Sequence, residues 1–211
     1  MKLPDNKFLI IGFTTPEAWK DPKEEASAID YFLNSGAIDI IHLRKPDSGK
    51  EYYEALIKEI SESSRGKLMT DRFPDLVNSQ GLLGLHLKSG RIDDVAYKLK
   101  TEGFLLSRSC HHQADYEESD TSTFDYTFLS PLFDSISKKG YNASPSLLDD
   151  SIEETTKVNK IIGMGGMTPD KFEKLYRLKF CGAALLGYLW QLNKTKEEIA
   201  RELTNARQKV Q

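Results

Sequence analysis

The chain has 211 residues, 39% of them hydrophobic, and no Pro- or Gly/Ser-rich linker divides it, so we expect a single domain with one core over residues 1–211. The formal net charge of −3, with lysines and carboxylates interspersed, argues against nucleic-acid and membrane partners and favours a small-molecule ligand. No leader opens the chain, no apolar run approaches the roughly 20 residues of a membrane span, and Cys110 and Cys181 lack metal-ligand spacing, which predicts a cytoplasmic protein with reduced cysteines.

Short apolar runs rich in β-branched and aromatic residues recur along the chain and have the length of strands. Between them lie segments with helical spacing of apolar residues and a charged opposite face. Eight such alternating units predict a small (β/α)8 TIM barrel of parallel strands, and an open doubly wound sheet is the alternative. The predicted strands are residues 8–13, 37–43, 67–70, 82–87, 104–107, 126–130, 160–164 and 181–186.

Glycines follow the seventh and eighth predicted strands. Gly165 and Gly166 have no Cβ, so backbone N–H groups at their turn are accessible to a ligand. Thr168 then suits a helix N-cap, and Pro169 suits the first helical position. Because the phosphate in TIM barrels commonly lies on the loops after strands 7 and 8, we expect Gly165, Gly166 and Gly187 to form a phosphate site, with ordinary turns as the alternative.

The second predicted strand ends in His42, Leu43 and Arg44. Side chains alternate along a strand, so if Leu43 faces the helices, His42 and Arg44 line the mouth of the barrel. An imidazole and a guanidinium in that place suit an anionic ligand. The alternative is a core histidine beside an arginine that is salt-bridged to a carboxylate.

The third and fourth strands also end in polar residues. Asp71 is interpreted as a magnesium ligand, as a base, as the N-cap of the next helix, or as the salt-bridge partner of a neighbouring arginine. His86 and Lys88 are in phase on the fourth strand, and His86 also fits a hydrogen-bonded core histidine.

The fifth strand leads into the densest group of reactive side chains, which includes Ser109, Cys110 and His111. Histidine has an ordinary pKa near 6.5 and suits proton transfer at neutral pH, so His111 is the candidate acid/base. Cys110 is not favoured as a nucleophile, because consecutive residues seldom present their side chains to one another.

A loop rich in hydroxyls and lysines, residues 130–141, follows the sixth strand. Lysine supplies a point charge and serine a hydrogen-bond donor, so this loop suits closure over an anion, while a solvated surface loop is the alternative. The candidate ligand contacts are Ser135, Ser137 and Lys138.

In order and position, these motifs resemble the family of small (β/α)8 barrels that contains thiamine phosphate synthase and the TenI-like thiazole tautomerases. The resemblance covers nearly the whole chain and implies a thiamine-biosynthesis enzyme with a small phosphorylated thiazole as its substrate. The matching segments are residues 41–44, 69–72, 84–87, 107–111, 131–140 and 162–170.

The synthase branch joins a pyrimidine diphosphate to a thiazole phosphate with magnesium, and this chain departs from its motifs. The family's Gln-x-Arg-x-Lys begins with His42 here and ends with Pro46, and only the acid, Asp71, remains of the Asn-Asp motif after the third strand. Arg91 stands about where the resemblance places the second magnesium ligand, and a cation there would repel the metal.

The tautomerase branch is similar in His-x-Arg, Arg-Ser-x-His and Met-Thr-Pro-Asp, all of which are present. The resemblance therefore implies a thiazole tautomerase that needs no cofactor, with a magnesium-dependent synthase (through Asp71) or a non-catalytic thiazole-phosphate-binding protein as the alternatives. The sequence is compatible with a homo-oligomer. The predicted catalytic residues are His111 and His42; the predicted substrate contacts are Arg44, Ser109, Ser135, Ser137 and Lys138, with Gly165, Gly166 and Gly187 at the phosphate.

Overall fold

The structure is a computed structural model that describes residues 3, 7–88, 92–111, 123–134, 145–148 and 160–210. Eight parallel strands pair in chain order, and β1 pairs with β8 to close the barrel. The predicted TIM barrel is therefore confirmed, and the open doubly wound sheet is wrong. The strands are β1 (Leu9–Phe13), β2 (Ile40–Leu43), β3 (Leu68–Thr70), β4 (Gly84–Leu87), β5 (Leu105–Cys110), β6 (Tyr126–Leu129), β7 (Ile161–Met164) and β8 (Gly182–Leu185).

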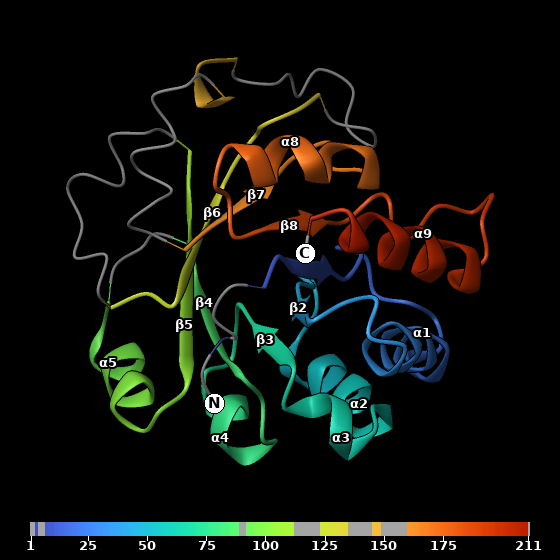
Figure 1. The fold of residues 1–211 in the computed structure, drawn as a ribbon. Coiled ribbons are helices and arrows are strands. Elements are labelled where there is room, and N and C mark those ends of the chain that lie inside the picture. Colours follow the sequence, from blue (N-terminus) through green and yellow to red (C-terminus); the bar gives the residue numbers. More distant parts are fainter. Residues whose placement is uncertain are drawn as a thin grey trace.

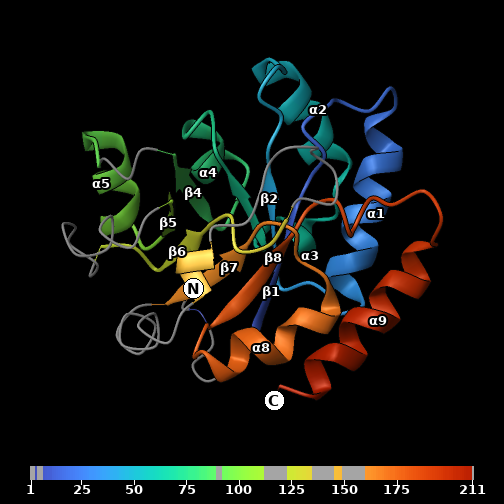
Figure 2. The ribbon, with the colours of Figure 1, turned by 90° about the horizontal axis from the view of Figure 1, so that it is seen from above.

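Helices surround the barrel in the order of the chain, so that the last helix, α9, lies beside the first, α1 (Figure 1, Figure 2). None of the described helices is long and apolar enough to cross a membrane. The helices are α1 (Pro22–Asn34), α2 (Lys50–Glu59), α3 (Glu62–Arg65), α4 (Asp75–Ser79), α5 (Asp94–Thr101), α8 (Phe172–Arg177) and α9 (Lys196–Gln208), with short 3-10 turns η1 (Pro145–Leu148) and η2 (Pro169–Lys171).

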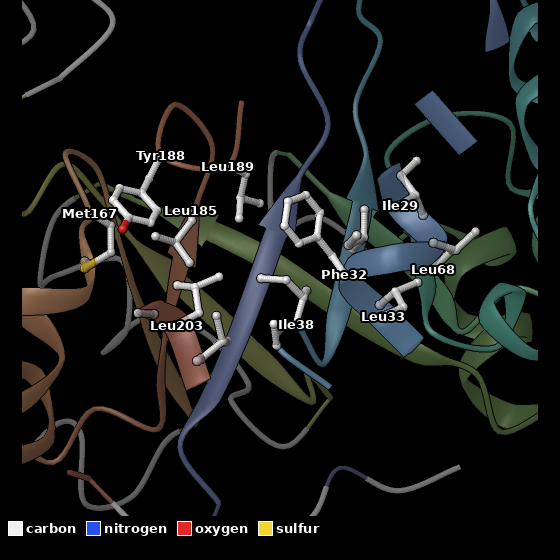
Figure 3. Packing of buried hydrophobic residues seen from close by; sticks show 14 of the residues in the cluster. Ile29, Phe32, Leu33, Ile38, Leu68, Met167, Leu185, Tyr188, Leu189 and Leu203 are labelled. Atoms are coloured by element: carbon white, nitrogen blue, oxygen red, sulfur yellow. The ribbon is translucent and has the colours of Figure 1, made fainter. Parts of the chain in front are cut away.

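Strand alternation divides the apolar residues between two layers. On β1, Leu9, Ile11 and Phe13 belong to the cluster inside the barrel, whereas Ile10 belongs to the cluster between the sheet and the helices. Figure 3 shows part of the outer layer, with residues of α1 such as Phe32 next to the strands. Both faces of each strand are covered, which explains why the strands are nearly continuous apolar runs.

β5 is longer than predicted. The prediction ended it at Ser107, because polar residues follow, but Ser109 and Cys110 still pair with β6, at Phe128 and Leu129. Cys110 is buried in the outer apolar cluster. Because the strand extends to Cys110, His111 comes directly at its carboxyl end, where TIM barrels have their active sites.

Two predicted helix starts differ from the structure. Thr168 occupies the N-cap position, but its side chain makes no capping hydrogen bond, and Pro169 opens the 3-10 turn η2 instead of an α-helix. Asp71 caps no helix, because α4 begins at Asp75 with Pro74 at the N-cap position.

Candidate active site

A pocket of about 710 Å³ opens at the carboxyl ends of the strands, and every strand or the segment directly after it contributes to its lining. Such a position is typical of the ligand site of a TIM barrel. Ser135, Ser137 and Lys138 lie outside the described residues. The predicted residues in the lining are His42, Arg44, Asp71, Ser109, His111, Gly165, Gly166 and Gly187, together with His86, Lys88 and Ser130.

His111 is the exposed histidine of the pocket. Its Nδ1 lies 3.1 Å from the carbonyl oxygen of Ser130, the residue that directly follows β6. A carbonyl only accepts hydrogen bonds, so Nδ1 is the donor in this shorter contact, and the basic nitrogen of the neutral ring is then Nε2; the Ser130 hydroxyl lies 3.4 Å from the same Nδ1. This arrangement gives a general base with a defined tautomer at the rim of the pocket.

His42 is buried, and its ring stacks on Phe13 with the centroids 4.7 Å apart. Its Nε2 lies 2.6 Å from the hydroxyl of Tyr126. Burial, with a smaller effect of His86, lowers the pKa of His42 well below its ordinary value. The ring is therefore neutral at physiological pH, so His42 can contact an anion only by hydrogen bonding and adds no positive charge.

Arg44 is the charged member of this pair. Leu43 belongs to the helix-facing cluster, which confirms the predicted alternation of side chains on β2. The Arg44 guanidinium is half-buried in the lining and makes no hydrogen bond or ion pair with any other described residue. The alternative of a salt-bridged arginine is thus wrong for this part of the chain.

His86 lies on the floor of the pocket, where its Nδ1 is 2.9 Å from Ser107 Oγ and its Nε2 is 3.2 Å from Ser109 Oγ. Burial lowers the pKa of His86 to about 4; the charge of Asp71 opposes this shift, and the charges of Lys88 and Arg44 add to it. His86 is both a hydrogen-bonded buried histidine and a member of the pocket.

Asp71 pairs with a lysine rather than with the predicted arginine. Its Oδ2 is 3.0 Å from Lys88 Nζ, and its Oδ1 accepts a hydrogen bond of 3.0 Å from the Tyr53 hydroxyl. Arg72 instead donates to the backbone carbonyls of Pro46 and Ser48, at 2.7 and 2.9 Å.

A magnesium ion does not fit this carboxylate well. Magnesium takes several oxygen ligands, but the Asp71 carboxylate already faces the Lys88 ammonium. Among the described residues, no group of three or more His, Cys, Asp or Glu side chains is arranged to hold a metal ion. Arg91 lies outside the described residues, and the predicted lack of a cofactor stays a prediction.

The turn after β7 needs both of its glycines. Gly165 has a φ of +97° and Gly166 a φ of +56°, and L-residues with a side chain rarely adopt such angles. A Cβ on Gly166 would also collide with the carbonyl of Asp134. The N–H groups of Gly166 and Gly187 make no hydrogen bond within the described part of the chain, although both residues line the pocket.

Sequence reasoning missed Lys45. This lysine is buried with Glu25 of α1, at 2.5 Å, and its Nζ also donates to the Glu17 carbonyl at 2.7 Å. Side chains alternate along β2, so Lys45 points away from the pocket and toward the helices. A lysine that faces this apolar layer needs a buried partner of opposite charge, and this signal could have predicted the ion pair. Trp190, another missed residue, lines the pocket and donates to the Phe13 carbonyl at 2.7 Å.

The family model for thiamine monophosphate synthase matches residues 11–188 of the chain. The chain belongs to this family. It is a family of thiamine-biosynthesis enzymes, so the family predicted from the order of the motifs is confirmed. No curated protein matches the chain.

Solved structures show the same fold. A thiamine phosphate pyrophosphorylase from Bacteroides thetaiotaomicron has a TM-score of 0.74 at 24% identity, and 96% of this chain and 97% of that chain are covered. A thiamine phosphate pyrophosphorylase from Pyrococcus furiosus has a TM-score of 0.74 at 14% identity, with 97% and 98% covered. The (S)-3-O-geranylgeranylglyceryl phosphate synthase from Thermoplasma acidophilum has a TM-score of 0.63 at 12% identity, with 97% and 95% covered. At these identities the likeness establishes the fold alone.

Proposed function

We propose that this family member is a metal-independent thiazole tautomerase, which converts a non-aromatic thiazole carboxylate phosphate into its aromatic isomer. The observation that carries the proposal is the hydrogen bond between His111 Nδ1 and the Ser130 carbonyl. His111 lines the pocket, and this hydrogen bond favours one tautomer of its ring, with the basic nitrogen available for proton transfer.

In the proposed reaction the N–H groups of Gly166 and Gly187 bind the phosphate, and Arg44 binds the carboxylate. His111 Nε2 removes one proton from the substrate and returns one proton to another atom of the same molecule, so composition and oxidation state are unchanged. Positioning and one acid/base are sufficient for such an isomerisation. Ser109 contributes a hydrogen bond from the end of β5, and contacts from Ser135, Ser137 and Lys138 stay predictions.

Thiamine phosphate synthase is the second candidate. The family's description and the two pyrophosphorylases of similar fold favour it. The pairing of Asp71 with Lys88 speaks against it, because the carboxylate that would bind magnesium already faces a cation. A non-catalytic thiazole-phosphate-binding protein is the third candidate.

One pair of assays separates the three candidates. The non-aromatic thiazole carboxylate phosphate is supplied with a chelator, and the aromatic product is followed; separately, the pyrimidine diphosphate and thiazole phosphate are supplied with magnesium, and thiamine phosphate is followed. We expect turnover in the first assay. Thiamine phosphate formed at a rate that depends on Asp71, tested with Asp71→Ala, would contradict the tautomerase proposal, and binding without turnover in either assay would support the third candidate.

The role of His111 is tested in the first assay. His111→Gln should lower the rate constant by about 10²-fold or more, as expected for the loss of a general acid/base. The affinity of the His111→Gln variant for the aromatic product serves as the control, and it should stay near that of the unmodified protein because the phosphate site is unchanged. An unaltered rate would assign the proton transfer to another residue.

A further inference from the structure

Lys88 lines the pocket from the end of β4 and has no role in the reaction proposed above. Its side chain is 56% exposed. No described residue accepts a hydrogen bond from its ammonium, since Asp71 Oδ2, although 3.0 Å away, makes no hydrogen bond. An ammonium has three N–H donors, so Lys88 is held by charge while its donors remain available to a ligand.

The group that holds Lys88 is itself rigid. The Asp71 carboxylate is 3% exposed and accepts from the buried Tyr53 hydroxyl, which in turn accepts from the Lys45 backbone N–H at 2.9 Å. A buried carboxylate with a fixed orientation keeps the neighbouring ammonium at one place in the pocket. Lys88 is therefore pre-positioned, although its side chain is long and solvent-exposed.

Register places Arg44 close to this ion pair. Leu43 pairs with Thr70, and Thr70 pairs with Leu85. The next residues along the three strands are Arg44, Asp71 and His86, which therefore lie side by side. All three of these residues line the pocket. Arg44 and Lys88 thus approach the same region from β2 and β4.

The charges that the ends of β2, β3 and β4 contribute to the pocket sum to one positive charge. Arg44 and Lys88 are cations, Asp71 is an anion, and the adjacent His42 and His86 are neutral. Glu17 also lines the pocket, but from the segment after β1, where it is exposed and its charge acts on Lys45. A ligand group with one negative charge complements the β2–β4 side of the pocket.

We infer that Lys88, together with Arg44, binds the carboxylate of the ligand and determines specificity for carboxylated substrates. The glycine turns after β7 and β8 lie across the closed barrel from β3 and β4 and bind the phosphate end. This inference rests on the proposed function, because the ligand carries a carboxylate as well as a phosphate.

The test measures the affinity of two ligands by calorimetry: the aromatic thiazole carboxylate phosphate and the same thiazole phosphate without its carboxylate. Lys88→Met removes the charge and nearly keeps the length of the side chain. It should weaken binding of the carboxylated ligand about tenfold or more, as for one charge-assisted hydrogen bond, and leave the affinity for the other ligand nearly unchanged. Lys88→Arg, which retains the charge, should restore most of the affinity.

Lys98→Met is the matched control, because Lys98 is a 75% exposed lysine on α5 whose pairing with Glu102 is a surface contact of 3.8 Å. It should change neither affinity. Equal weakening of both ligands by Lys88→Met, or no weakening, would overturn the inference and leave the tautomerase proposal intact. Selective weakening without any turnover would support Lys88 and contradict the tautomerase proposal, and failure of both ligands to bind would contradict both.

Discussion

His42 and His86 are neighbours on the floor of the pocket, with ring centroids 5.4 Å apart, and both are buried. Each neutral ring has hydrogen-bonding partners, but neither has a carboxylate close enough to form an ion pair within the described residues. A proton on either ring would therefore be a buried charge without a partner. In the proposed reaction we therefore assign proton exchange to the exposed His111, while the two buried rings shape the floor of the pocket.

The burial of His86 predicts a loss of stability in acid. In the unfolded chain His86 is protonated near pH 6.5, whereas in the folded state its pKa is about 4. The unfolded state therefore binds more protons between these two pH values. The free energy of unfolding should fall by up to about 1.4 kcal/mol per pH unit as the pH decreases through this window. Glu25, whose pKa burial raises, contributes with the opposite sign at low pH, so a comparison between variants is needed.

Urea unfolding of the unmodified protein and of His86→Gln from pH 7 to pH 5 isolates this contribution. The free energy of unfolding should change less with pH in the variant, because glutamine does not titrate. Parallel curves for the two proteins would show that His86 binds its proton equally in both states.

At the scale of elements, one buried ammonium connects three segments around the pocket. Lys45, directly after β2, contacts Glu25 of α1 at 2.5 Å and also donates to Thr15 Oγ1 at 3.3 Å and to the Glu17 carbonyl at 2.7 Å. Thr15 and Glu17 line the pocket. The position of the segment after β1 thus depends on an ion pair outside the pocket.

Lys45→Met should destabilise the fold by roughly 3–5 kcal/mol, because it leaves the Glu25 carboxylate buried without its cation. The double variant Glu25→Gln/Lys45→Met removes both charges and should recover much of this stability, as measured by urea unfolding. Both variants should raise KM more than they lower kcat, since the segment after β1 loses its attachment in each. A double variant as unstable as the single one would mean that the ion pair itself stabilises the fold.

The barrel as a whole is closed by contacts between the first strands and the last strand and helix of the chain. β8 pairs with β1, and Arg207 of α9 donates to the Gly36 carbonyl at 2.7 Å and to Asp39 at 2.7 Å, at the segment before β2. The same carboxylate accepts from the Ile10 backbone N–H at 2.8 Å. The last helix therefore holds the first two strands together at the end of the barrel opposite the pocket.

Arg207→Met should lower the free energy of unfolding by roughly 3 kcal/mol, because a buried charged network loses its central donor. Arg201→Met, on the exposed face of the same helix, should change it by no more than about 0.5 kcal/mol. The kcat of both variants should match that of the unmodified protein at a temperature where they are folded. Equal stability of the two variants would contradict the closing role of Arg207.

Apart from the end of β5, which lies at Cys110 and not at Ser107, local sequence by itself predicted the order of the strands, a TIM barrel with an open sheet as the alternative, and a common place for His42, Arg44, His111 and the Gly165–Gly166 turn. It could do so because strand alternation, helical periodicity and the backbone freedom of glycine are properties of neighbouring residues. Only the tertiary structure decided that the partner of Asp71 is Lys88 instead of the predicted arginine, and that Lys45 is buried with Glu25. These pairs join different elements, and burial, which decides the charge of His42 and His86, arises only when the whole barrel has closed.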